Sequence, residues 1–162
     1  MKRRLNTPLL LLTVTLLLAC GRVEEPLSGS ATMTMEAGLT RNPLMRPLLA
    51  GRTYRIQVGV SPDYGDGGIP ADADGWLDTG PAGALLVGAV NLLALKTVSH
   101  VPFYAVTACY GNGYGRCFQV GRETRFTAEA GGGLNFFVND ARGMFFNNTG
   151  VATITITLAE QD

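Results

Sequence analysis

The sequence predicts an all-β fold, an antiparallel β-sandwich or jelly roll formed by a single domain. Three observations favour this fold class. Short segments of alternating apolar and polar residues recur along the chain, 21 glycines and 8 prolines punctuate them, and no segment has the period of an amphipathic helix. Roughly six to eight short strands separated by turn residues are typical of sandwiches and jelly rolls.

The chain begins with the features of an export signal. Residues 1–4 are positively charged, and Leu9 to Leu18 form an apolar stretch too short to span a bilayer comfortably. The following Ala19-Cys20 completes a pattern that resembles the lipobox of bacterial lipoproteins, in which the cysteine is acylated and becomes the new N-terminus. An ordinary cleaved signal is the alternative interpretation. Since Gly21 is not an acidic retention residue, the resemblance implies an outer-membrane lipoprotein of the bacterial cell envelope.

The predicted organisation has three parts. Residues 1–19 are the lipoprotein signal peptide, and residues 20–30 are a lipidated tether because they carry Pro, Gly and Ser without an apolar period. Residues 31–162 form one β-sandwich domain, since neither an internal repeat nor a second boundary is evident. Removal of the signal leaves ten basic against 13 acidic residues. A mildly acidic domain gives no electrostatic reason to bind nucleic acid.

The predicted strands differ in how clearly they alternate. The last is the clearest, because Ile154, Ile156 and Leu158 share one face and threonines occupy the other. Residues 84–90 form a short, wholly apolar run, which predicts a strand buried on both faces. Residues 92–95 are either a short helical turn or a loop packed on the core. The other predicted strands span residues 31–37, 53–60, 103–107, 117–120, 123–128, 134–138 and 151–158.

Two cysteines predict a disulfide. Cys109 and Cys117 flank a glycine-rich loop at residues 110–116, flexible enough to bring the two sulfurs together in an oxidising compartment. A zinc site is excluded, because two thiols and the single distant His100 do not supply four ligands.

Enzyme chemistry is not supported. Ser99 and His100 are adjacent, so on a strand they would point to opposite faces, and no nucleophile elbow is present. The carboxylates that could act as a pair fall in one Gly/Pro-rich stretch, which predicts solvated turns rather than a glycosidase site. These carboxylates are Asp63, Asp66, Asp72, Asp74 and Asp78.

The segment from Asn139 to Gly150 is the candidate site. It places Asp140, Asn147 and Asn148 in a turn between two predicted strands. Their oxygens are hard donors, and they could form half of the shell of six to eight oxygens that Ca²⁺ takes. Open positions on such an ion would accept the hydroxyls of a ligand. A simple turn, in which Asn and Gly tolerate positive φ, is the alternative.

The pattern Asn139-Asp140-x-x-Gly143-x-x-x-Asn147-Asn148-Thr149-Gly150 resembles the calcium loop of bacterial galactophilic lectins of the PA-I type. Weaker similarities are Val58-Gly59-Val60 leading to Tyr64-Gly65, and the stretch at residues 83–88. The resemblance implies a jelly-roll domain that binds one Ca²⁺ and captures galactose through its 3- and 4-hydroxyls.

By position, the resemblance implies side-chain ligands from Asp140, Asn147 and Asn148 and main-chain carbonyl ligands from Tyr64 and Met144. The expected sugar-binding set is Asp140, Asn147, Asn148, Tyr64 and Ala141.

This chain also departs from the family. Residues 69–75 contain no histidine where those lectins have a histidine and a glutamine that touch the sugar, and residues 91–118 form an insertion that could cover or extend the site. Tyr64, Trp76 and Phe145 are the nearest aromatic residues for a sugar contact, or else belong to the core.

The predicted function is calcium-dependent binding of a galactose-like carbohydrate by a lipoprotein anchored to the membrane at Cys20. The alternative is a structural or protein-interaction lipoprotein in which Ca²⁺ only pins the loop. The sequence leaves open whether the protein forms a homo-oligomer.

Overall fold

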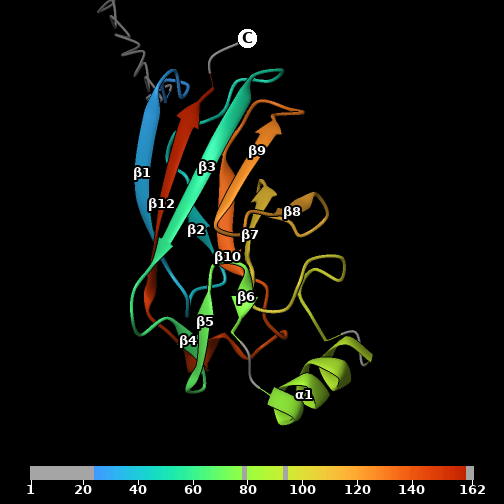
Figure 1. Cartoon of the computed structure of the whole chain (residues 1–162). Helices are drawn as coiled ribbons and strands as arrows, with labels where there is room; N and C mark the ends of the chain where they lie inside the picture. Colours follow the sequence, from blue (N-terminus) through green and yellow to red (C-terminus); the bar gives the residue numbers. More distant parts are fainter. Residues whose placement is uncertain (1–23, 78–79, 93–94, 160–162) are drawn as a thin grey trace, which may run out of the picture.

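The computed structural model describes residues 24–77, 80–92 and 95–159. The predicted signal peptide and Cys20 lie outside these residues. Two four-stranded antiparallel sheets pack face to face, and a smaller sheet closes one end (Figure 1). The all-β sandwich expected from the sequence is confirmed.

The first large sheet has the strand order β1-β12-β3-β9, and the second has the order β2-β10-β7-β8. Their bounds are β1 Ser30–Glu36, β12 Val151–Leu158, β3 Thr53–Val60, β9 Glu123–Thr127, β2 Asn42–Pro43, β10 Leu134–Val138, β7 Val106–Tyr110 and β8 Cys117–Gln119. The small sheet has the order β11-β4-β5-β6, with β11 Asn148–Thr149, β4 Gly65–Asp66, β5 Ile69–Asp72 and β6 Gly75–Trp76. A 3₁₀ turn, η1, spans Phe145–Asn147.

The core lies between the two large sheets. In β12 the alternate residues Ala152, Ile154 and Ile156 are fully buried, as their spacing predicts, while the threonines between them face outward. The central strand β10 is buried along its whole length, because sheet and loops cover both of its faces. Packing begins earlier than the boundary expected at Ala31, since Leu27 is fully buried.

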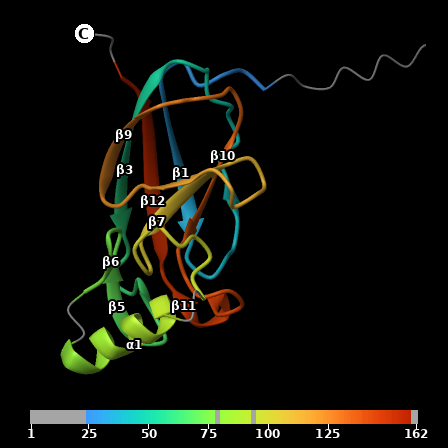
Figure 2. The ribbon, with the colours of Figure 1, turned by 90° about the vertical axis from the view of Figure 1, so that its right-hand side faces the viewer.

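The direction of β1 determines where the chain enters the domain. Ser30 pairs with Thr157 near the end of β12, whereas Glu36 pairs with Val151 at its start. The start of β12 follows β11, so the first described residues and the small sheet lie at opposite ends of the sandwich. The ribbon views agree (Figures 1 and 2).

The strand predicted at residues 84–90 is wrong. These residues belong to helix α1, Gly80–Leu92, which lies at the small-sheet end of the molecule (Figure 2). A short apolar run does not distinguish a buried strand from a helix by periodicity. Two local features favour the helix: Pro81 occupies its first turn, and Ala and Leu are good helix formers. The turn or loop considered for residues 92–95 is described only at its two ends: Leu92 is the last residue of α1, Leu95 is not helical, and residues 93–94 lie outside the described part.

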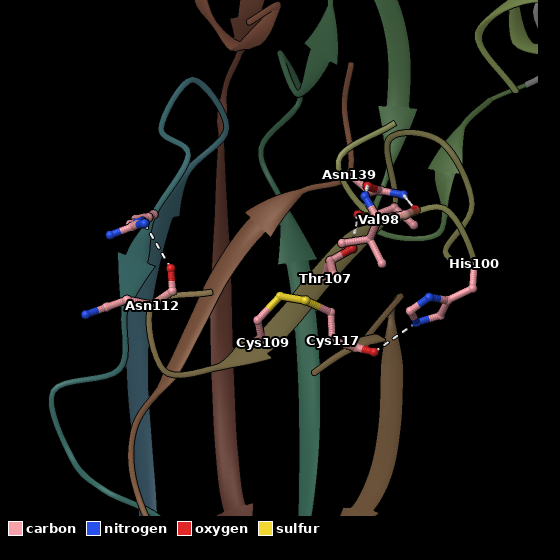
Figure 3. Close-up of a disulfide and its surroundings, with 9 residues drawn as sticks. Val98, His100, Thr107, Cys109, Asn112, Cys117 and Asn139 are labelled. Carbon is pink, nitrogen blue, oxygen red and sulfur yellow. Dashed lines mark hydrogen bonds between the residues drawn. A yellow bond between two sulfur atoms is a disulfide. The ribbon is translucent and has the colours of Figure 1, made fainter. Parts of the chain in front are cut away.

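The disulfide between Cys109 and Cys117 is confirmed. The two cysteines are directly opposite each other in the antiparallel pair of β7 and β8, and the glycine-rich loop connects these strands (Figure 3). The bond therefore closes the hairpin at the edge of the second sheet.

Replacing Cys109→Ser should lower the free energy of unfolding by about 2–3 kcal/mol, because the unfolded chain is no longer constrained by the short disulfide loop. Urea unfolding of the variant and of wild type measures the difference. Reduced wild type is the control and should unfold at the urea concentration of the variant. Equal stability of oxidised wild type and variant would contradict the expectation.

Candidate metal and ligand site

Two segments distant in sequence meet at the small-sheet end. Strand β11 pairs with β4, so that Asn148 lies opposite Asp66 and Thr149 lies opposite Gly65. The Thr149 hydroxyl donates a hydrogen bond to the Asp63 carbonyl at 2.7 Å. These contacts bring the residues around Tyr64, predicted as part of the site, to the loop that precedes β12.

Gly150 makes this close approach feasible. Its φ is +80°, and a Cβ at this position would lie 2.6 Å from the Tyr64 Cα. Any other residue would strain the backbone and push the two segments apart. The sequence motif therefore ends in glycine because a side chain at this position would collide with the backbone of Tyr64.

Asn139 holds the other side of the loop. Its side-chain amide donates to the carbonyls of Val98 and Val101 at 2.9 Å, and its oxygen accepts the Val98 N–H at 2.8 Å (Figure 3). Thr97 donates both its N–H and its hydroxyl to the Asp140 carbonyl, each at 3.0 Å. The segment after α1 thus fixes the backbone of Asp140, and Asn139 is a positioning residue.

The three side chains predicted as ligands share one unusual property. One oxygen of each, Asp140 Oδ2, Asn147 Oδ1 and Asn148 Oδ1, is buried without a hydrogen-bond partner. A buried acceptor without a donor costs about 1–3 kcal/mol, and carboxylate and amide oxygens are ligands that Ca²⁺ takes.

The remaining polar atoms of these side chains are paired. Asp140 Oδ1 accepts the Ala141 N–H, the Asn147 amide donates to Asp66, and the Asn148 amide donates to the Ala37 carbonyl at 3.2 Å. Because each amide nitrogen is held by an acceptor, the amide oxygens are the atoms left unpaired. This donor set fits Ca²⁺, which prefers carboxylate, amide and carbonyl oxygens.

The other predicted site residues are placed differently. Ala141 and Met144 line the same cavity as Asp140 and Asn147, whereas Tyr64 does not. The Tyr64 ring is buried, and its backbone lies close to Gly150. The carbonyls of Tyr64 and Met144 already accept hydrogen bonds from Ala71 at 3.1 Å and Asn147 at 3.3 Å. Each retains a second lone pair for a cation.

Asp66 is the residue that the sequence interpretation missed. It was expected in a solvated turn, but its exposed fraction is 7%, it lines the cavity, and it accepts the Asn147 amide. The pairing of β4 with β11 buries it, and two-residue strands leave no periodic pattern in a sequence. The site therefore has two carboxylates rather than one.

The two carboxylates affect each other. Burial raises the pKa of Asp140 to about 6, and the charge of Asp66 raises it further, while the Ala141 N–H and the neighbouring Asn148 side chain oppose the shift. Burial also raises the pKa of Asp66.

Within the described residues, neither Asp66 nor Asp140 makes an ion pair. The described residues also contain no cluster of three or more His, Cys, Asp or Glu side chains, so a metal here would need the amide and carbonyl oxygens as well. Lys96 pairs with Ala141 beside this loop, but its ammonium donates to the Val101 carbonyl at 2.8 Å rather than to either carboxylate.

A cavity of about 420 Å³ opens beside these oxygens. Trp76 is half-buried and packs edge-to-face on Phe103 at 4.6 Å between ring centroids. Phe103 and Leu95, both in the predicted insertion, contribute to the wall, so the insertion extends the site. Phe145 belongs to the core. The lining residues are Asp66, Gly67, Ile69, Trp76, Leu86, Leu95, Phe103, Asp140, Ala141, Met144 and Asn147.

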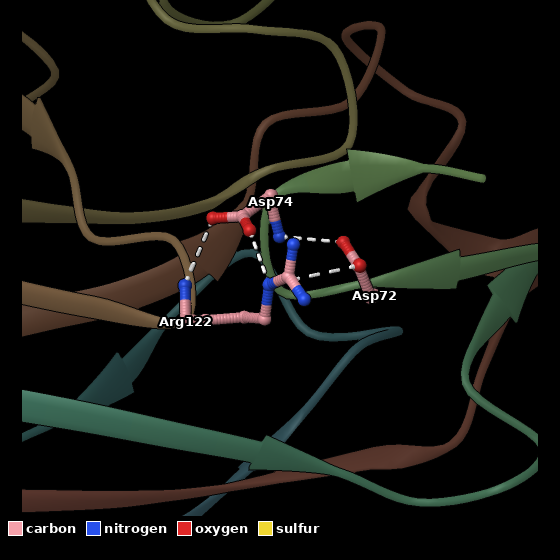
Figure 4. A network of polar contacts seen from close by, with 3 residues as sticks. All are labelled: Asp72, Asp74 and Arg122. Carbon is pink, nitrogen blue, oxygen red and sulfur yellow. Dashed lines mark hydrogen bonds and ion pairs between the residues drawn. The ribbon is translucent and has the colours of Figure 1, made fainter.

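Of the other carboxylates considered as candidates, Asp63 is exposed and accepts the Ser61 hydroxyl at 2.6 Å, Asp78 lies outside the described residues, and Asp72 and Asp74 are structural. Asp74 accepts the Arg122 N–H at 3.0 Å and pairs with the Arg122 guanidinium, which also lies 3.9 Å from Asp72 (Figure 4). This contact lowers the pKa of Asp74. The cluster joins the β5–β6 turn to the turn before β9.

His100 is exposed, as expected, and its ring bonds to the Cys117 carbonyl at 2.9 Å (Figure 3). Ser99 is also exposed. Neither residue lines the cavity. No serine–histidine pair therefore faces the candidate site.

Replacing Asp140→Asn should stabilise the calcium-free protein by about 1–2 kcal/mol at pH 7, because it removes a buried charge. The folded protein binds the Asp140 proton more tightly than the unfolded chain. The contribution of Asp140 to the free energy of unfolding should therefore fall as the pH rises from about 4 to about 6, so the stability of the variant relative to wild type should increase over this range. Urea unfolding in EDTA across this range measures both effects, and a variant less stable than wild type at pH 7 would contradict them.

Comparison with known proteins supports the fold. No family model and no curated protein matches the chain. A solved structure described as the EclA N-terminal domain, a PllA-like lectin, matches at 15% sequence identity with a TM-score of 0.57. The match covers 79% of this chain and 95% of that chain. The protein therefore has a lectin-like β-sandwich fold.

Proposed function

We propose that the protein binds a galactose-like carbohydrate through a Ca²⁺ ion held by Asp140, Asn147 and Asn148. The observation that carries this proposal is the set of three buried oxygens without partners, beside a second carboxylate at Asp66. Two carboxylates would neutralise the ion, and the amide and carbonyl oxygens would leave coordination positions open.

The cavity beside these oxygens gives a sugar access to the ion. A pair of neighbouring hydroxyls would occupy the open positions, and the half-buried Trp76 would lie against the sugar ring. The resemblance of the loop to that of galactophilic lectins and the lectin-like fold both support a carbohydrate over other hydroxylated ligands. The proposed activity is binding, without catalysis.

A lipid anchor at Cys20 would present this site away from the membrane. The chain enters the sandwich at the end opposite the small sheet, so an acylated N-terminus leaves the cavity facing outward. We therefore infer display from the bacterial cell envelope, with the outer membrane as the expected location. No helix among the described residues is long and apolar enough to cross a membrane.

The alternative is a calcium ion that only stabilises the loop. One observation favours it: Asn148, whose oxygen is unpaired, does not line the cavity. An ion held mainly by Asn148 would lie away from the cavity, where a ligand could not reach it. The protein would then act as a structural or interaction lipoprotein.

Calcium titrated into the chelator-stripped chain from residue 21 should bind and raise the melting temperature of wild type. Asp140→Ala should abolish both effects, because it removes a charged ligand. Asp74→Asn is the matched control, since Asp74 pairs with Arg122, and it should respond to calcium like wild type. Calorimetry and thermal unfolding measure the two effects, and an unchanged calcium response of Asp140→Ala would place the ion elsewhere.

Galactose should then bind wild type only when calcium is present. Calorimetric titration of galactose and a panel of other monosaccharides, each with calcium and with EDTA, tests this dependence. Calcium binding without binding of any sugar would favour the structural alternative. Sugar binding that survives EDTA would contradict coordination of the sugar by the ion.

A further inference from the structure

The loop between β7 and β8 carries a pair of residues whose chemistry the candidate site does not use. Asn112 and Gly113 lie within this loop, between the two cysteines of the disulfide, and both are exposed. They form the only Asn-Gly dipeptide in the sequence. A backbone nitrogen attacks the preceding asparagine side chain most readily when it belongs to glycine, because glycine has no Cβ to block the approach and leaves the backbone free to rotate.

The other asparagines whose side chains the structure describes are held in place. Each is fully or partly buried, and most donate their amide to an acceptor. These residues are Asn42, Asn135, Asn139, Asn147 and Asn148. Asn112 differs because it is exposed, and within the described part of the chain its side chain makes no hydrogen bond. Its amide is therefore free to approach the neighbouring backbone.

A cation contacts the backbone at this dipeptide. The Arg41 guanidinium donates a hydrogen bond to the Asn112 main-chain carbonyl at 2.9 Å (Figure 3). That carbonyl and the Gly113 nitrogen belong to the same peptide group. A charged donor on the oxygen stabilises the negative charge that this group carries when its nitrogen loses the proton. Among the described residues the Gly113 N–H donates to no backbone acceptor, so the nitrogen is both free and activated.

We propose that Asn112 is a site of spontaneous deamidation in the folded protein. The deprotonated Gly113 nitrogen attacks the side-chain carbonyl carbon of Asn112, and the new C–N bond closes a cyclic imide. The side-chain NH₂ leaves as ammonia, which takes up the proton that the nitrogen lost. Water then adds to one of the two imide carbonyls and breaks its C–N bond to the ring nitrogen. The product is a carboxylate, on an aspartyl side chain or beside an isoaspartyl linkage.

The modification would place a negative charge beside a positive one. The new carboxylate at position 112 would lie next to Arg41, and Arg116 follows in the same loop. Neither Asn112 nor Gly113 lines the cavity beside the candidate calcium site. The inference is therefore independent of the proposed function, and each can fail without the other.

The test compares the rate of deamidation in the folded and unfolded states. The oxidised chain from residue 21 is incubated at mildly alkaline pH, in buffer and in denaturing urea, and the peptide that contains Asn112 is followed by mass spectrometry. Folded wild type should react at least ~3-fold faster than unfolded wild type, because Arg41 meets the Asn112 carbonyl only in the folded chain. A folded rate equal to or below the unfolded rate would overturn the inference.

Arg41→Met keeps the length of the side chain but removes its charge. It should slow the reaction at least ~3-fold in the folded protein and leave the rate in urea unchanged. Arg46→Met is the matched control, since Arg46 donates to the carbonyls of Glu25 and Pro26 instead, and it should react like wild type. Equal folded rates for Arg41→Met and wild type would overturn the role of the cation and with it the inference.

Gly113→Ala tests the attacking nitrogen. A Cβ at position 113 would meet nothing within 4 Å, so the variant should fold like wild type, which urea unfolding checks. The added methyl group crowds the attack, and the reaction should slow at least ~10-fold in both states. Deamidation of Gly113→Ala at the wild-type rate would show that the ammonia is lost by direct hydrolysis and would overturn the proposed step.

Discussion

The small-sheet end of this domain depends on one electrostatic constraint. Asp66 and Asp140 are both buried, and the unpaired oxygens of Asn147 and Asn148 lie with them, without a cationic side chain in ion-pair contact among the described residues. Burial of such groups is unfavourable unless a positive charge compensates it. The surrounding contacts hold the oxygens in place against this repulsion.

Those contacts come from parts of the chain that lie far apart in sequence. The Asn139 amide secures the segment after α1, the Thr149 hydroxyl secures the residues before β4, and Gly150 allows the two backbones to approach closely. The loop runs from the end of β10 at Val138 to the start of β12 at Val151. The two large sheets therefore hold both of its ends. A loop with buried, uncompensated polar groups is tolerated where it is anchored at both ends in this way.

The same arrangement connects stability with ligand binding. An ion that neutralises the carboxylates would stabilise the fold and also present open positions to the cavity, so structural and binding roles need not exclude each other. Two apolar side chains, Leu86 of α1 and Leu95 of the segment after it, also line the cavity. A β-sandwich with a lectin-like fold commonly obtains its specificity from loops and insertions of this kind.

The sequence by itself determined the sandwich, most of its strands, the Cys109–Cys117 bond and the loop from Asn139 to Gly150, because each leaves a local signal: alternation, spacing or turn chemistry. Tertiary structure decided the rest. Residues 84–90 are helical rather than extended, since a short apolar run fits either state until its surroundings are known. Asp66 joins the site only because β4 pairs with β11, and a pairing between residues this far apart leaves no pattern along the chain.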